Sequence, residues 1–118
     1  MAHNAGGSLQ QGISAEKLDK VWVFRSSQLF SDAERIALEF SIAAASQPND
    51  VSDEMFEEIK KFWGEGQIVE IAALASYFGF MNRWNDTMAT PLEEHPIEIA
   101  EKHISQNGWK LGKHKPTD

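Results

Sequence analysis

The hydrophobic pattern is organised around one long apolar segment, residues 67–90. Its first half is apolar almost all the way round a helix, and its polar interruptions are Glu70, Ser76 and Tyr77. A helix that is apolar on every side belongs in the interior of a bundle. The second half changes to Asn82-Arg83-Trp84-Asn85-Asp86, and Pro91 ends the helical pattern. The pattern therefore predicts a long buried central helix that carries a polar and aromatic cluster towards its C-terminal end.

Helix boundary signals predict further helices before and after this segment. Ser31-Asp32-Ala33-Glu34 has the spacing of a capping box, in which a serine and a glutamate exchange hydrogen bonds with each other's backbone N–H. Ser14 and Ser52 are N-cap residues for two shorter helices, and Pro96 belongs to the first turn of a last one. Gly12 and Gly108 have the positions of C-terminal stops.

Side-chain periodicity adds detail to the helix that begins after Ser52. Its inward positions include Ile59, Phe62 and Trp63, and Glu57 and Lys61 have the i,i+4 spacing of an exposed ion pair. Residues 22–30 predict an ordered connection, and no run alternates with the period of two expected of a strand. We expect one all-α domain over residues 1–118, a small helical bundle in which the tail 109–118 packs only through Trp109.

Composition excludes several classes of function. Eighteen acidic against eleven basic residues give a net charge of −7, the wrong sign for holding a phosphate backbone, so we expect no nucleic-acid partner. Cysteine is absent, which excludes a disulfide, a thiolate nucleophile or a cysteine-based zinc site within these residues. The first residues lack the basic segment and the apolar run of a secretory signal peptide. The apolar run of residues 68–81 is too short to cross a bilayer. These features predict a cytoplasmic protein without a membrane span.

Three segments together resemble the carboxymuconolactone decarboxylase-like family, which includes the alkylhydroperoxidase D-like proteins. They are residues 30–40, residues 51–56, and Ile68-Val69-Glu70-Ile71 continuing into Asn82-Arg83-Trp84-Asn85-Asp86. The resemblance implies an alkylhydroperoxidase D-like fold, self-association and, for several family members, reduction of hydroperoxides by a Cys-x-x-Cys pair with a histidine four residues later.

The opening Met1-Ala2-His3-Asn4-Ala5-Gly6 is similar to the family's residues immediately after that cysteine pair, so the resemblance makes His3 the motif histidine of a proton relay. Both cysteines would then precede Met1, and the chain as written is expected to be inactive as a thiol peroxidase. Two explanations stay open. The chain is an N-terminally incomplete product of a longer gene, or it is a cysteine-free relative that kept the bundle and its pocket.

Six residues are candidates for a site. His3 and Glu70 are the catalytic candidates, Glu70 because it is the one charge among apolar positions and is expected to be desolvated. The substrate-binding candidates are Asn82, Arg83, Trp84 and Asn85, where a guanidinium can pair with an anion and an indole offers a flat apolar wall. Equally, the asparagines can tie the helix end to neighbouring loops, and Arg83 can pair with Glu70, Asp86 or Glu93. Histidine spacing fits no recognised ligand set, so no metal and no cofactor are expected.

The expected function is that of a carboxymuconolactone decarboxylase-family protein related to peroxidase-type oxidoreductases, without redox cysteines of its own. The alternatives are a non-catalytic module that binds a small molecule, and a cysteine-free decarboxylase or lyase. Four tryptophans and seven phenylalanines exceed what a bundle of this size readily buries, so we also expect a homo-oligomer.

Overall fold

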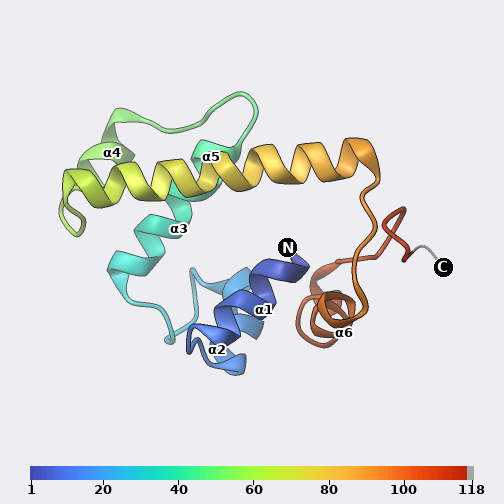
Figure 1. Ribbon diagram of the computed structural model, residues 1–118. Helices are drawn as coiled ribbons and strands as arrows, with labels where there is room; N and C mark the ends of the chain where they lie inside the picture. Colours follow the sequence, from blue (N-terminus) through green and yellow to red (C-terminus); the bar gives the residue numbers. More distant parts are fainter. Residues whose placement is uncertain (117–118) are drawn as a thin grey trace. The chain divides into compact units, whose positions relative to one another are not determined.

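The computed structural model describes residues 1–116, and every regular element in that range is helical (Figure 1). The all-α prediction is confirmed. The α-helices are α1 (Ala2–Gln10), α2 (Ala15–Asp19), α3 (Asp32–Ala45), α4 (Asp53–Ile59), α5 (Glu65–Met88) and α6 (Glu94–His103). Two short 3₁₀ turns, η1 (Val21–Val23) and η2 (Ser105–Asn107), complete the set. The elements form two compact units, one of residues 1–29 and 86–118 and the other of residues 30–85.

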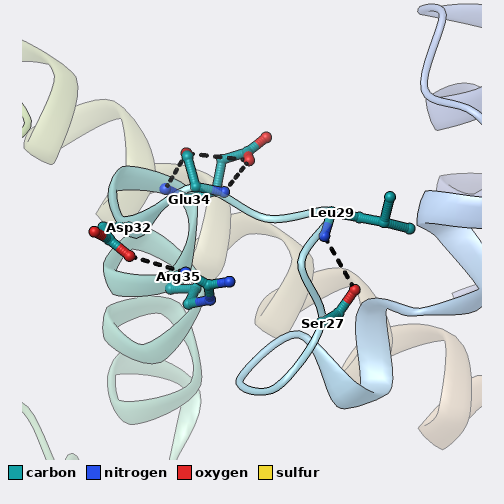
Figure 2. Close-up of polar contacts among 6 residues, drawn as sticks. Ser27, Leu29, Asp32, Glu34 and Arg35 are labelled. Carbon is teal, nitrogen blue, oxygen red and sulfur yellow. Dashed lines mark hydrogen bonds and ion pairs between the residues drawn. The ribbon is translucent and has the colours of Figure 1, made fainter.

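Helix α3 begins at the capping box that the sequence predicts. The Ser31 hydroxyl accepts a hydrogen bond from the Glu34 backbone N–H at 3.2 Å, and the Glu34 carboxylate accepts from the Ser31 N–H at 2.9 Å (Figure 2). Two donors that have no partner inside the helix are thereby satisfied. Ser14 and Ser52 cap α2 and α4 in the same way, each through one side-chain hydrogen bond. All three serine caps are confirmed.

Left-handed residues come after three of the helical elements. Gly12 follows α1 with φ of 90°, and Gly108 follows η2 with φ of 91°. Glycine adopts this conformation without the steric penalty that a Cβ brings. The predicted stop at Gly12 is confirmed, whereas Gly108 ends η2 and not the last α-helix, which already ends at His103. Ala89 after α5 is also left-handed, with φ of 52°, and its Cβ makes that conformation strained.

The core of the second unit lies between α3, α4 and the first part of α5. Phe40, Ile59 and Ile68 are buried together. Half-buried side chains pack against them, among them Trp63, which lies between α4 and α5, and Ile71 and Ala72 of α5. The Trp63 indole N–H donates to the Ala33 carbonyl at 2.9 Å, which satisfies its one polar group while the ring packs.

The predicted burial of the long helix is wrong, although its position and length are right. Within α5, all of which is described, Ile68 is the buried residue, while Val69, Tyr77, Phe80 and Trp84 are more than half exposed. A helix that is apolar all round can pack against neighbours on any of its sides. In this fold α3 and α4 cover only one side of α5. The rest of the apolar surface of α5 faces outward.

Two details of the α4 region also differ from the prediction. Phe62 is exposed instead of buried, because α4 already ends at Ile59. Each lysine pairs with the glutamate three residues before it, whereas the sequence predicts a separation of four: Lys60 contacts Glu57 at 2.7 Å, and Lys61 contacts Glu58. Both are i,i+3 pairs on the surface, where such pairs contribute about 0–1 kcal/mol.

In the first unit, α1 packs on α6 through small side chains. Ala2 and Ala100 are buried with Ile104, and Leu92 and Trp109 lie against them. The tail is held by more than Trp109, which corrects the prediction: the His114 carbonyl accepts from the Leu92 N–H at 3.0 Å. None of the helices among residues 1–116 combines the length and the apolar character that crossing a bilayer requires.

Candidate functional site

The four predicted substrate-binding residues lie near the C-terminal end of α5. Because successive residues of an α-helix are turned by about 100°, Asn82, Arg83, Trp84 and Asn85 point in four different directions. Asn85 is half-buried, and the other three are exposed. These side chains do not converge on one point from α5 alone, so a pocket that used all four would need walls from other elements.

Arg83 has a partner that the sequence analysis did not consider. Its Nη2 donates to Oε1 of Gln47, in the loop after α3, at 3.0 Å. Asp86, one of the expected partners of Arg83, lies 3.4 Å from His114 Nε2 and 3.5 Å from Lys113 Nζ. The contact with the neutral amide of Gln47 orients the guanidinium, a group that can bind an anion through two parallel hydrogen bonds.

Glu70 is exposed on α5, so the prediction that it is desolvated is wrong. It lies only two residues after the buried Ile68, and a helix turns by about 200° over that interval. Its carboxylate therefore points away from the core. The catalytic role of Glu70 stays a prediction that its surroundings do not favour.

His3 lies on α1, and its Nε2 is 2.9 Å from Oε2 of Glu93, the residue before α6. Both side chains are exposed. A hydrogen bond from its own backbone N–H, and then the charge of His3, hold the pKa of Glu93 below its usual range. A carboxylate at one ring nitrogen fixes the orientation of an imidazole, which is the arrangement that a proton relay uses. His3 belongs to the first unit and Glu70 to the second.

A second histidine–carboxylate pair was missed by the sequence analysis. His103 is buried at the end of α6, and its Nδ1 lies 2.7 Å from Oδ1 of Asp19 at the end of α2. The available signal was the position of His103 three residues after the inward-facing Ala100, which places both on one face of α6. Among residues 1–116, no group of three or more potential metal-ligating side chains comes together.

Comparison with known proteins identifies a similar sequence and similar solved structures. No protein-family model matches the chain. Over 80 residues it is 34% identical to the uncharacterized protein YnjA of Escherichia coli strain K12, an alignment that covers 68% of this chain and 44% of YnjA.

Two solved structures of the debrominase Bmp8 are similar over 86% of the chain. The ligand-free enzyme superposes with a TM-score of 0.78, and a cysteine-to-alanine variant in complex with 2,3,4-tribromopyrrole with 0.79, both at 29% identity. The chain shares its fold with Bmp8. Bmp8 has a fold of the carboxymuconolactone decarboxylase-like, alkylhydroperoxidase D-like type. The comparison therefore supports the fold that the three sequence segments predict. The chain spans 54% of Bmp8 and so about half the length of the proteins that it matches.

Proposed function

We propose that the chain is a carboxymuconolactone decarboxylase-family protein that binds a small, flat, anionic or halogenated molecule without a thiol of its own. The observation that carries this proposal is the likeness to Bmp8, which extends over most of the chain at 29% identity. The likeness supports a relation between the two proteins, and the ligand class is our extension from it.

The absence of cysteine is compatible with binding. The 118 residues contain no cysteine, whereas the Bmp8 complex was obtained with a variant in which a cysteine is replaced by alanine. In that protein, the bromopyrrole is therefore held without the replaced thiol. A relative that lacks cysteine can keep the binding step while it lacks the thiol chemistry.

Within this chain, the C-terminal part of α5 offers the groups that such a ligand needs. The Arg83 guanidinium supplies positive charge and is oriented by Gln47, and the exposed Trp84 indole supplies a flat apolar surface. Asn82 and Asn85 supply amide donors and acceptors on other sides of the helix. We assign the first contact with an anionic ligand to Arg83, because charge attracts over a longer range than stacking.

The test is a thermal-unfolding titration with 2,3,4-tribromopyrrole and with benzoate as a simple aromatic carboxylate. We expect the melting temperature to rise, since a ligand at 100 times its dissociation constant adds about 2.7 kcal/mol of stability. Arg83→Gln should lose the response to benzoate, whereas the matched control Arg25→Gln, at an exposed arginine of the first unit, should keep it. No stabilisation of the unchanged protein by either compound at millimolar concentration would refute the proposal.

The hydrogen-bonded pair of His3 and Glu93 favours a second candidate, a peroxidase-type oxidoreductase in which His3 relays protons. The thiols would have to come from outside these 118 residues. The intact mass of the protein isolated from its source decides between the two: a mass above 13.3 kDa with a Cys-x-x-Cys pair would favour peroxidase chemistry, and a mass of 13.3 kDa would exclude it. A lyase reaction with His3 and Glu70 as acid and base requires that both His3→Ala and Glu70→Gln abolish turnover.

A further inference from the structure

The C-terminal tail contacts the connection between α5 and α6, residues 89–93, within the first unit. The tail contains a tight turn, in which the His114 N–H donates to the Leu111 carbonyl at 3.2 Å and Gly112 has φ of 58°. A residue with a Cβ would be strained at that angle, so the glycine permits the turn. The turn brings His114 against the connection, where its backbone carbonyl accepts from the Leu92 N–H at 3.0 Å.

The His114 imidazole makes two further contacts with the same region. Nδ1 lies 2.9 Å from the Thr90 carbonyl oxygen, and Nε2 lies 3.4 Å from a carboxylate oxygen of Asp86 in the last turn of α5. The contacts of this one residue therefore hold the chain on both sides of Ala89, whose left-handed backbone is strained. His114 and its contacts with Asp86, Thr90 and Leu92 form what we call the latch.

The two groups that face the imidazole can only accept hydrogen bonds. A backbone carbonyl and an ionised carboxylate donate nothing, so the contact with Thr90 requires a proton on Nδ1. The contact with Asp86 is attractive only when Nε2 carries a proton as well. In the neutral ring with a proton on Nδ1, the Nε2 lone pair faces a negative charge. The geometry therefore favours the imidazolium, which has both protons.

We propose that the latch is a pH-dependent fastening of the connection between α5 and α6, closed while His114 is charged and opened when the imidazole loses its proton. Imidazole changes its charge between about pH 5 and 8, so the latch responds in that range. The neutral ring loses its attraction to Asp86, and the strain at Ala89 favours release of the segment. Because the closed latch holds the charged ring, acid pH closes it and alkaline pH opens it.

A second positive charge competes for the same carboxylate. Lys113 Nζ lies 3.5 Å from the Asp86 oxygen that His114 Nε2 contacts. Among residues 1–116, Asp86 is the acidic residue within ion-pair distance of the His114 ring, and α1 and α6 contribute none. Lys113 keeps its charge throughout this pH range, so it reduces the size of the pH response without changing its direction.

Hydrogen exchange of the Leu92 amide reports on the latch directly, because the His114 carbonyl protects that N–H. After correction for the intrinsic pH dependence of exchange, we expect its protection to fall by about two- to five-fold between about pH 5 and 8, the effect of a partly exposed ion pair. The Ile104 amide, which donates to the Ala100 carbonyl in the core of the first unit, should show no such fall. Constant protection at Leu92, or an equal fall at Ile104, would overturn the proposal.

Three variants assign the response to its residues. His114→Gln keeps a donor that cannot be charged and should remove the pH response, while the matched control His95→Gln, at an exposed histidine of α6, should keep it. Lys113→Gln removes the competing charge and should enlarge the response. A response that persists in His114→Gln or disappears in Lys113→Gln would refute the latch. These measurements use no ligand, so their outcome is independent of the proposed function.

Discussion

Nδ1 of the buried His103 lies 2.7 Å from the carboxylate of Asp19, and this contact joins the ends of α2 and α6 across 84 residues of sequence. The imidazole is almost completely covered, while about half of the Asp19 side chain is exposed. Loss of the contact would therefore leave the His103 ring nitrogen without its hydrogen-bond partner, because water does not reach that nitrogen freely. The pair fastens α2 to α6 within the first unit.

Asp19→Ala should lower the free energy of unfolding by about 1–3 kcal/mol, because it leaves a buried polar nitrogen without its partner. Asp19→Asn keeps an acceptor oxygen and should cost less. Urea denaturation measures both changes. Glu98→Ala is the matched control: its contact with His95, at 3.9 Å, joins two exposed side chains and should contribute less than about 0.5 kcal/mol. Equal losses in Asp19→Ala and Glu98→Ala would show that the buried pair is not specially stabilising.

The pKa of Glu93 should be measurably low, and His3 should account for only part of the shift. The hydrogen bond from its own backbone N–H is the larger cause, and the charge of His3 is the next. In His3→Gln the pKa of Glu93 should therefore rise but stay below the usual glutamate value of about 4.3. Carboxyl carbon NMR shifts recorded against pH give both values. A full return to the usual value in His3→Gln would contradict this order of causes.

The lowered pKa of Glu93 also sets the direction of a pH effect on stability. A carboxyl group that is more acidic in the folded chain stabilises it above the unfolded pKa, and this contribution is lost as the pH falls through the folded pKa. Glu93→Gln should thus reduce the pH dependence of stability at and below about pH 4.3, the usual glutamate pKa. Unfolding free energies measured from about pH 3 to 5 test this. A steeper dependence in the variant would show that the sign is wrong.

Ile59→Ala should be among the most destabilising changes in the second unit. Ile59 is 0% exposed and packs with Phe40 and Ile68. Truncation of a fully buried isoleucine costs about 2–5 kcal/mol, from lost transfer energy and from the cavity that remains. Ile42→Ala makes the same chemical change where half of the side chain is exposed and should cost much less. Similar losses at the two positions, measured by urea denaturation, would indicate that Ile59 does not belong to the folded core.

The sequence predicts features that depend on neighbours a few residues away. The capping box at Ser31 and Glu34, the other serine caps and the left-handed Gly12 are of this kind, because each depends on residues within about one helical turn. The positions of the main helices come from the same signals. The expected Glu57–Lys61 pair failed because α4 ends at Ile59, and helix ends are the least determined part of such a pattern.

Features that depend on distant parts of the chain could not be predicted in this way. Periodicity shows that α5 is apolar on several sides, but it does not show which side is covered, so it does not tell that Ile68 is buried and that Phe80 is exposed. The partners of the candidate site residues are equally remote: His3 contacts Glu93 across 90 residues, and Arg83 contacts Gln47 across 36. Local sequence therefore identifies which residues can take part in a site, while their partners come from the fold.

The cap of α3 offers a last comparison between two serines of one region. Ser31→Ala removes the acceptor for the Glu34 N–H and should cost about 0.5–2 kcal/mol. Ser41 lies within the same helix, and its hydroxyl donates to the Ala37 carbonyl, which already belongs to the helical hydrogen-bond pattern. Ser41→Ala removes the same atom but replaces serine by the better helix former, so it should be neutral or slightly stabilising. Circular dichroism melting curves of the two variants measure the difference, and a larger loss in Ser41→Ala than in Ser31→Ala would contradict the role given to the cap.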